Sequence, residues 1–518
     1  MPLACRADAC SIAQPHPLTP PQIALINGKS AEAESLYRAE IARSPSDEEL
    51  TAGLVDALLS EQKIDDAAAT IQAALGHDPQ SPALLTALAA VQHRQGLPWE
   101  EEKTLNAAQV KGICYAPLHL ALADFFRFNS YYATALRQIQ LAHQLDPYSP
   151  EIRREWTETL PVSQRIEELK KYLAGKNSDT PEVRSAKMEL AVLESRQENA
   201  SGCHLVSQIT TATDIPFTPI MYNADLVRAW GLEVAFNGHK SHLMIDTGAS
   251  GLYINSALAK KAGLKPITQV QASGIGDNGP QSGYLAEADS IKVGGLEFKN
   301  CPVEVSDRHD VVGTDGLIGM NVFSQFAVTL DFPWRKLTLG PLPRYPGTAA
   351  APVNLNTEGQ GEHTSDSGPH DRYEAPEMAD WMKVYHAGHA LIVPGAINSK
   401  KVGLFLIDTG GQMSVLSPKT ADGITKVHSE DASGFRGISG DVKHVYYADD
   451  VTVRFGNLEQ KNARMTLFDL SGTSRSFGTE ISGILGADTL DMLVIHIDYR
   501  DGLMKFEFSA DRGYQHFR

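Results

Sequence analysis

The sequence contains little cysteine, a deficit of positive charge and no long apolar run. Its 518 residues include five cysteines, and their positions show no pairs spaced as metal ligands. The 46 Lys and Arg residues are outnumbered by 63 Asp and Glu residues, which gives a net charge of −17. A surface with this charge repels nucleic acid and anionic lipid, so neither is expected as a partner. No apolar stretch approaches the length of a membrane span.

The N-terminal segment MPLACRADACSIAQPHPLTPP also lacks a basic stretch followed by an apolar one, so no secretory signal can be identified in it. We leave the compartment open, with a periplasmic or secreted location as the expectation. In an exported protein Cys203 and Cys301 could form a disulfide. Otherwise the cysteines are interpreted as free or buried thiols.

The first part of the chain is helical and repetitive. The segments HDPQSP and LDPYSP place Pro79 and Pro147 two periods of about 34 residues apart, and Ala67 and Ala135 keep the same register. This period resembles that of tetratricopeptide repeats. The resemblance implies an all-α solenoid over residues 19–200, with C-terminal cap helices, whose groove binds a protein or peptide partner.

Beyond Gly202 the composition changes to short runs in which Val, Ile, Thr and Phe alternate with polar residues and glycine is frequent. This pattern predicts an almost entirely β region. Residues 345–380 are rich in Gly, Pro and charged side chains and predict a linker between two β units. The expected domains are therefore a tail, the helical repeats, a first β lobe, the linker and a second β lobe, at 1–18, 19–200, 220–344, 345–380 and 381–518.

The two β units are copies of each other. LMIDTGASGLYI corresponds to LFLIDTGGQMSVL, which places Asp246 and Asp408 in equivalent positions. ASGIGDNGPQSGYLAEAD, from Ala272, corresponds to ASGFRGISGDVKHVYYAD, from Ala432. DGLIGMNVFSQFAVTLDF in turn corresponds to SGILGADTLDMLVIHIDY. Three landmarks that recur in the same order at nearly constant offsets indicate an internal duplication.

The duplicated motif resembles that of the aspartic peptidases of the pepsin and retroviral types. In that family each lobe contributes an Asp-Thr-Gly loop that follows an apolar strand, and a later apolar-apolar-Gly segment passes beneath the loop. Here the later segments are Leu317-Ile318-Gly319 and Ile484-Leu485-Gly486. The resemblance implies an all-β bilobal fold and an aspartic-type endopeptidase activity.

Hydrolysis of a peptide bond requires an activated water and an acid for the departing nitrogen. Two carboxyl groups about 3 Å apart cannot both ionise, so the pair holds one proton and supplies both functions. Asp246 and Asp408 are the candidate catalytic pair, expected to face each other within one chain.

The remaining candidate site residues follow from the same resemblance. Thr247 and Thr409 are expected to bond across to the opposite loop, and Gly248 and Gly410 to allow its tight turn. Ser250 and Ser414 are further candidates for support. The flap and substrate-binding candidates are Gly274, Gly276, Tyr284, Gly437 and Gly440.

One departure from the family pattern keeps an alternative open. The residue after Asp-Thr-Gly is Ala249 in the first lobe but Gly411 in the second, where a missing side chain would loosen the carboxylate. The alternative is a catalytically inactive, peptidase-like scaffold that binds peptides. A third possibility is a processing peptidase with a narrow specificity.

No cofactor and no metal site are expected. The loop residues His363, Asp366, His370 and Asp371 could in principle bind a metal, but so polar a loop is interpreted as solvent-facing. His386 and His389 are interpreted as strand or turn residues.

Overall fold

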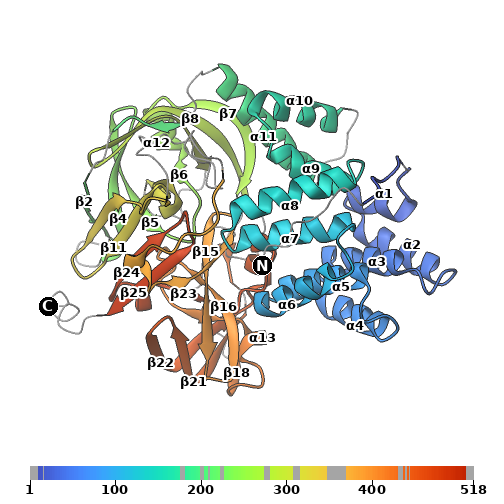
Figure 1. The fold of residues 1–518 in the computed structure, drawn as a ribbon. Helices are drawn as coiled ribbons and strands as arrows, with labels where there is room; N and C mark the ends of the chain where they lie inside the picture. The colour runs from blue at the N-terminus through green and yellow to red at the C-terminus, as the bar shows by residue number, and fades with distance from the viewer. Residues whose placement is uncertain are drawn as a thin grey trace. The chain divides into compact units, whose positions relative to one another are not determined.

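The computed structural model of the protein describes residues 10–15, 17–174, 181–198, 203–207, 211–221, 227–272, 281–306, 315–346, 369–429, 436–437, 440–442 and 444–508. The chain divides into two compact units. One contains Met1–Glu194 with Gly478–Glu480, and the other contains Ser195–Phe477 with Ile481–Arg518. In Figure 1 the helices come first along the chain and the strands follow.

The first unit consists of helices that pack against their neighbours in sequence. Their bounds are α1 (Pro20–Ile26), α2 (Ser30–Ile41), α3 (Glu48–Ser60), α4 (Ile64–Leu75), α5 (Pro82–Arg94), α6 (Pro98–Gln109), α7 (Ala116–Phe128), α8 (Tyr132–Leu145), α9 (Pro150–Glu158), α10 (Val162–Leu173) and α11 (Pro181–Glu198). The starts of α3, α5, α7 and α9 follow one another at a constant period of about 34 residues. The expected repeat period is therefore confirmed.

The repeated Ser-Pro segments begin helices. The Ser81 hydroxyl accepts a hydrogen bond from Leu84 N, and the Ser149 hydroxyl accepts one from Ile152 N. Each serine is the N-cap and the proline that follows is the first helical residue, where a missing N–H costs nothing. The repeated Ser-Pro segments therefore cap the N-termini of α5 and α9.

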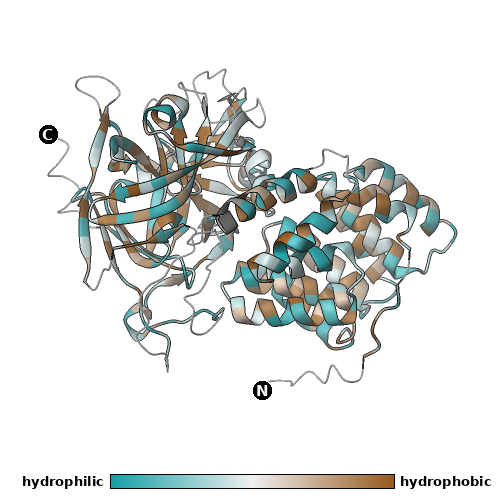
Figure 2. Ribbon diagram, turned by 90° about the horizontal axis from the view of Figure 1, so that it is seen from above, coloured by the Kyte–Doolittle hydropathy of each residue, from teal (hydrophilic) through white to brown (hydrophobic). Residues whose placement is uncertain are grey.

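Alanines and leucines of the repeats form the core between helices. Ala67, Ala135 and Ala142 are almost completely buried, where the absence of a larger side chain allows helices to approach closely. Figure 2 shows hydrophobic residues recurring along the helices between hydrophilic ones. This is the pattern of helices that bury one face and expose the other.

The second unit is built from strands, and β1–β12 form lobe 1 and β13–β25 form lobe 2. The strands of lobe 1 are β1 (His204–Leu205), β2 (Thr213–Pro216), β3 (Thr218–Met221), β4 (Val227–Phe236), β5 (His239–Asp246), β6 (Leu252–Asn255), β7 (Lys265–Ala272), β8 (Gln281–Val293), β9 (Leu296–Ser306), β10 (Gly316–Gly319), β11 (Phe326–Asp331) and β12 (Lys336–Pro341). Its short helical segments are α12 (Ser256–Lys261) and η2 (Met320–Phe323).

Lobe 2 repeats this succession of strands. Its strands are β13 (Met382–Lys383), β14 (Tyr385–Ala387), β15 (Ala390–Ile397), β16 (Lys401–Ile407), β17 (Val415–Leu416), β18 (Val427–Ser429), β19 (Arg436–Gly437), β20 (Gly440–Asp441), β21 (Val445–Phe455), β22 (Leu458–Phe468), β23 (Gly483–Leu485), β24 (Leu493–Asp498) and β25 (Leu503–Phe508). The helical segments are η3 (Pro376–Met378), α13 (Pro418–Ala421), α14 (Ser471–Phe477) and α15 (Ala487–Leu490).

The sheet topology repeats the duplication seen in the sequence. The central order β6-β10-β5-β4 of the lobe 1 sheet corresponds to β17-β23-β16-β15 of the lobe 2 sheet. A third sheet, with the order β13-β25-β24-β11-β12-β2, takes strands from both lobes. Strands β11 and β24 pair antiparallel at its centre, and the Thr329 hydroxyl lies 3.0 Å from His496 Nδ1. These two residues occupy equivalent positions of the duplication, so the pseudo-twofold axis passes between them.

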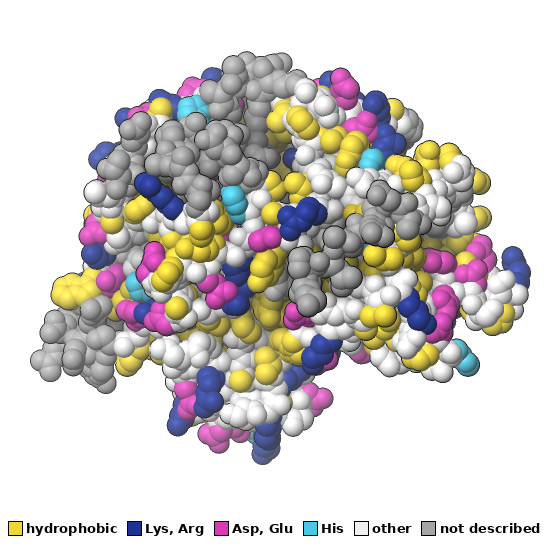
Figure 3. All heavy atoms as spheres, viewed as in Figure 1, with side chains coloured by type: hydrophobic (Ala, Val, Ile, Leu, Met, Phe, Trp, Pro, Cys, Tyr) yellow, Lys and Arg dark blue, Asp and Glu magenta, His cyan; other side chains and the backbone are white. Residues whose placement is uncertain are grey.

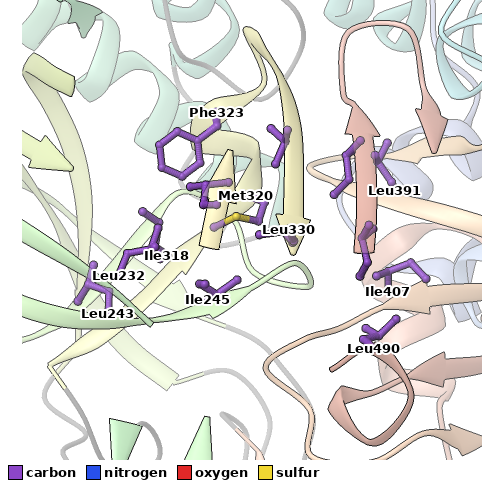
Figure 4. Close-up of a cluster of buried hydrophobic side chains, with 14 of the residues drawn as sticks. Leu232, Leu243, Ile245, Ile318, Met320, Phe323, Leu330, Leu391, Ile407 and Leu490 are labelled. Atoms are coloured by element: carbon purple, nitrogen blue, oxygen red, sulfur yellow. The ribbon is translucent and has the colours of Figure 1, made fainter. Parts of the chain in front are cut away.

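One hydrophobic core extends through both lobes. It contains apolar side chains from the strands of each. Figure 4 labels lobe 1 members (Leu232, Leu243, Ile245, Ile318, Met320, Phe323, Leu330) and lobe 2 members (Leu391, Ile407, Leu490). Because this core is shared, each lobe on its own would expose apolar surface that is buried in the pair.

The segment expected to be a linker is anchored near its C-terminal end. Ala375 and Met378 are buried against Leu503, and Arg372 donates to Asp501 O at 2.7 Å. The Asp501 carboxylate also accepts a hydrogen bond from the Tyr345 hydroxyl at 3.1 Å. Residues 369–380 of this segment are therefore anchored by apolar and polar contacts, because apolar side chains are interspersed among the polar ones there.

Two disulfides link distant segments, one within each unit. Cys10 is bonded to Cys114, and Cys203 to Cys301. The second pair was the one considered from the sequence, whereas the first was not foreseen because spacing does not determine connectivity. Two disulfides are compatible with an extracytoplasmic location.

The described helices include none long and apolar enough to cross a membrane. On the face drawn in Figure 3, acidic and basic side chains are interspersed rather than gathered by sign. No group of three or more His, Cys, Asp and Glu that could hold a metal occurs among the described residues. Of the loop residues considered for a metal, His363 and Asp366 lie outside the described part, and His370 stacks on Tyr345 with ring centroids 4.1 Å apart.

Candidate active site

Asp246 and Asp408 each follow a buried apolar strand and lie in equivalent places of the two lobes. Asp246 ends β5, and Asp408 follows β16 directly. Strand β10 runs parallel to β5, with Gly319 opposite Asp246, and β23 runs parallel to β16, with Asp408 N donating to Leu485 O at 3.0 Å. The later apolar-apolar-Gly segments thus pass beside the aspartates, as the sequence predicted.

The two Asp-Thr-Gly loops are joined across the lobe boundary by a reciprocal set of hydrogen bonds. Thr247 N donates to Thr409 Oγ1, and Thr409 N donates to Thr247 Oγ1, both at 3.1 Å. The Thr247 hydroxyl donates to Ile407 O at 2.7 Å, and the Thr409 hydroxyl donates to Ile245 O at 3.0 Å. Every polar group in this set has a hydrogen-bond partner. The two loops are therefore held together without leaving any of these buried polar groups unpaired.

The carboxyl groups of the two lobes meet between these loops. A Cβ placed on Gly410 would lie 2.5 Å from Asp246 Oδ2, and a Cβ placed on Gly248 would lie 3.1 Å from Asp408 Cγ. Each glycine therefore packs against the carboxyl of the opposite lobe, and only hydrogen fits in place of a side chain at Gly410. Close approach, rather than an unusual backbone conformation, is the reason for glycine at these two positions.

Backbone N–H groups support both carboxyls. Gly248 N donates to Asp246 Oδ1 at 2.9 Å. Gly410 N and Gly411 N both donate to Asp408 Oδ1 at 3.0 Å. The support from Gly411 is made by its N–H, so the missing side chain that distinguishes lobe 2 leaves this contact in place.

Burial is the largest influence on the dyad and raises the pKa of both carboxyls. For Asp246 the neighbouring Asp408 raises the pKa further, whereas the N–H groups of Gly248 and Ala249 lower it. At Asp408 the N–H groups of Gly411 and Gly410 oppose the effect of burial on the pKa. Asp246 and Asp408 influence each other's protonation, so the pKa values belong to the pair.

A second set of polar residues holds the segment after each loop. In lobe 2 the Ser414 hydroxyl lies 2.7 Å from Asp488 Oδ1 and accepts a hydrogen bond from Gly486 N at 3.0 Å. In lobe 1, Gly251 N donates to Asn321 Oδ1 at 2.9 Å. Sequence reasoning missed Asp488 and Asn321, although both stand two residues after the glycine of the apolar-apolar-Gly segment. The side chain of the other support candidate, Ser250, is exposed.

The flap candidates are described only in part. Gly274 and Gly276 lie outside the described residues. Tyr284 lies on β8, between Gln269 of β7 and Val305 of β9, and its half-buried ring packs against the shared core. Gly437 and Gly440 face each other in the β19–β20 hairpin. The structure thus brings Thr247, Gly248, Thr409 and Gly410 to the dyad and places Tyr284 in a strand of lobe 1.

His389 contributes to the site although the sequence indicated only a strand or turn residue. It does lie in the turn between β14 and β15, and its Nε2 lies 3.0 Å from the carbonyl oxygen of Gly248. This contact joins lobe 2 to the Asp246 loop of lobe 1. The two residues are 141 positions apart in the chain, and nothing in the local sequence indicates that they meet.

Comparison with known proteins agrees with this geometry. Residues 232–322 and 393–489 match the family described as aspartyl protease, one segment in each lobe, and residues 24–91 match a tetratricopeptide repeat family. A sequence comparison with curated proteins finds no match.

Three solved structures are among those similar to parts of this chain. An aspartic proteinase from Irpex lacteus is 12% identical with a TM-score of 0.35, over 58% of this chain and 99% of that one. A retropepsin-like aspartic protease from Rickettsia conorii is 23% identical with a TM-score of 0.20. The match covers 26% of this chain and 96% of that one. A TPR protein from Thermus thermophilus is 18% identical with a TM-score of 0.27, over 34% and 95%.

The two segments of the aspartyl protease match contain the two Asp-Thr-Gly loops that meet at the candidate site, and the repeat match lies within the helical unit. The helical unit therefore contains a segment similar to tetratricopeptide repeats, and each lobe of the second unit contains a segment similar to the aspartyl protease family.

Proposed function

We propose that the second unit of the chain, the β unit that contains both lobes, is an aspartic endopeptidase. In it Asp246 and Asp408 activate a water for attack on a peptide carbonyl. The observation that carries the proposal is the convergence of two buried carboxyls, each at the end of a buried strand: a Cβ placed on Gly248 would lie 3.2 Å from Asp408 Oδ1 and 3.3 Å from Asp246 Oδ1. A structural ion pair would require a positive partner, whereas the contact here is between two acids. Such a pair is stable only when it holds a proton, which is the state that acid–base catalysis requires.

In the proposed reaction the ionised member of the pair takes a proton from water while the protonated member donates a hydrogen bond to the substrate carbonyl. The resulting tetrahedral species collapses when a proton reaches the departing nitrogen from the pair. Atoms balance, because the water supplies the hydroxyl of the new acid and the proton of the new amine. Gly248, Gly410 and Gly411 supply N–H groups that stabilise the carboxylate form.

The proposal is tested by incubating the full chain with a broad peptide library across a range of pH, with and without pepstatin. We expect cleavage by the wild-type chain and none by Asp246→Asn or Asp408→Asn. Asp422→Asn, which alters an exposed aspartate, is the matched control and should cleave normally. Binding of library peptides without cleavage by the wild-type chain would favour the inactive scaffold instead.

Mixing the two single variants tests whether one chain holds a complete site. Every molecule in the mixture lacks one member of its own pair, so we expect the mixture to remain inactive. Recovery of cleavage on mixing would show that the aspartates pair between chains and would contradict the assignment to a single chain.

We further propose that the tetratricopeptide repeats bind a peptide or protein partner, since such repeats present extended surfaces for that purpose. The test uses the Asp246→Asn chain, which would retain a protein substrate without cleaving it. Addition of that substrate should slow hydrogen exchange in α3, α5, α7 and α9. Slower exchange confined to the β unit would contradict a binding role for the repeats.

A further inference from the structure

His389 of lobe 2 lies outside the duplicated motif and contacts the Asp246 loop of lobe 1. Strands β14 and β15 pair with Ala387 opposite Ala390, which leaves Gly388 and His389 as a two-residue turn. Gly388 has a φ of +59°, in the left-handed region where glycine is favoured. A two-residue turn with glycine first is a tight hairpin turn, so the direction of the His389 side chain is well defined.

The hydrogen bond of His389 fixes the tautomer of its ring. The distance from His389 Nε2 to Gly248 O is 3.0 Å, and a carbonyl oxygen can only accept. The proton of the neutral ring must therefore be on Nε2. Burial lowers the pKa of His389, and the hydrogen bond to Gly248 opposes this effect. The ring also contacts Phe477, with centroids 5.7 Å apart, so the side chain is held on one side by packing and on the other by the hydrogen bond.

The residue that His389 contacts also supports the Asp246 carboxyl. Gly248 accepts the hydrogen bond of His389 at its carbonyl and donates its own N–H to Asp246 Oδ1 at 2.9 Å. The next N–H, that of Ala249, shares a peptide group with this carbonyl and donates to the main-chain oxygen of Asp246 at 3.3 Å. A restraint on the Gly248 carbonyl from lobe 2 therefore acts on the carboxyl and the backbone of Asp246 through Gly248.

We propose that His389 is a positioning residue of the dyad, which holds Gly248 in place from lobe 2 and thereby maintains the hydrogen bond from Gly248 N to Asp246 Oδ1. The proposal rests on the proposed peptidase function for its catalytic consequence. Its structural consequence, an influence of His389 on the Asp246 carboxyl, does not depend on catalysis. The two consequences are therefore measured separately.

The catalytic test compares three chains. His389→Leu keeps a similar bulk and removes the donor, whereas His389→Gln keeps an N–H group at about the same distance from the backbone. We expect His389→Leu to lower kcat about 10- to 100-fold with KM little changed, because a displaced reacting group costs rate rather than binding. The glutamine variant should recover most of the loss. Equal activity of the leucine variant and the wild type would overturn the proposal.

The second test measures stability against pH and needs no activity. Asp246 has a raised pKa in the folded state, so its contribution to the free energy of unfolding falls as pH rises from 3.8 toward that folded pKa. Loss of the His389 hydrogen bond should weaken the donation from Gly248 N that lowers the Asp246 pKa, and so raise this pKa further and extend the fall by a few tenths of a pH unit. His389→Leu made in the Asp246→Asn chain should cause no such shift in the pH dependence of the free energy of unfolding.

The outcomes of the second test separate positioning from packing. His389→Leu could destabilise the wild-type chain and the Asp246→Asn chain by the same amount at every pH. This result would show that His389 acts by packing and would overturn the proposal. A wild-type chain without peptidase activity would contradict the proposed function. The shift in the Asp246-dependent pH profile would still decide whether His389 acts on the carboxyl.

Discussion

The hydroxyl of Thr247 accepts a hydrogen bond from Thr409 N, and the hydroxyl of Thr409 accepts one from Thr247 N, both at 3.1 Å. Each hydroxyl also donates to a strand carbonyl of the opposite lobe. The arrangement is symmetric because the two loops are copies, and it crosses the lobe boundary four times. It determines how closely Asp246 and Asp408 can approach each other.

Removing one hydroxyl from this set should loosen the site and destabilise the β unit. Thr409→Val keeps the shape but leaves Thr247 N without an acceptor and Ile245 O without the Thr409 donor. We expect a loss of roughly 2–4 kcal/mol in the free energy of unfolding, since each buried group left unpaired costs about 1–3 kcal/mol. Peptidase activity should fall as well. Thr409→Ser keeps the hydroxyl and is the control, and equal stability of the two variants in urea would contradict the prediction.

The glycines beside the dyad should differ sharply in their tolerance of a methyl group. Gly410→Ala would place Cβ 2.5 Å from Asp246 Oδ2, so the carboxyl must move and we expect activity to fall by about 100-fold or more. Gly411→Ala places Cβ 3.1 Å from Asp408 Oδ2, which a small shift can relieve, and it restores the residue type of lobe 1. We expect it to keep most of the activity. Similar loss in both variants of this matched pair would show that the spacing around the carboxyls does not control the reaction.

The stability of the β unit should depend on the proton shared by the dyad. Burial and, to a lesser extent, the neighbouring Asp408 raise the pKa of Asp246 well above its ordinary value of 3.8. The folded state therefore binds more protons than the unfolded state between these values, and stability falls as pH rises through this window. Asp246→Asn should remove the part of the fall that belongs to Asp246 and be more stable than wild type above the window. Parallel stability profiles for the two chains would contradict the raised pKa.

A similar stability effect is expected at a third buried carboxyl, that of Asp498. The pKa of Asp498 is raised to about 7 by burial and then by its neighbour Asp501. Its Oδ1 accepts from Asp501 N at 3.0 Å, while Oδ2 is buried with no hydrogen-bond partner among the described residues. Asp498→Asn should therefore reduce the loss of stability that wild type shows between pH 3.8 and about 7, by the part that belongs to Asp498. The measurement is the free energy of unfolding in urea at several pH values, and an unchanged slope would contradict the prediction.

The disulfides should contribute to stability in both units. Cys10–Cys114 and Cys203–Cys301 close loops with sequence separations of 104 and 98. Loops of this length correspond to about 4–5 kcal/mol each in the chain-entropy description. We expect a reducing agent to lower the melting temperature of the wild-type chain by several degrees. In the Cys203→Ala/Cys301→Ala chain, reduction should cause only the decrease in melting temperature that comes from Cys10–Cys114 in the helical unit. A melting temperature of the wild type that does not change on reduction would argue against both bonds.

The sequence by itself determined the architecture, because the signals that carry it are periodic or repeated. The repeat period places α3, α5, α7 and α9, and the Ser-Pro segments identify helix starts through local capping. The duplicated Asp-Thr-Gly loops identified Asp246 and Asp408 together, since a single Asp-Thr-Gly triplet would have been weak evidence for a catalytic residue. These features depend on neighbours in sequence, so they can be read without coordinates.

Only the tertiary structure showed which distant groups touch. The contact of His389 with Gly248 spans 141 positions of the chain, and the anchoring of Arg372 on Asp501 spans 129. Asp488 and Asn321 acquire their roles because β23 and β10 bring them beside the loops. Such contacts are set by the packing of strands from two lobes, and the residue types involved are common in turns and loops. Their identity therefore carries no signal until the fold has placed them within hydrogen-bonding distance.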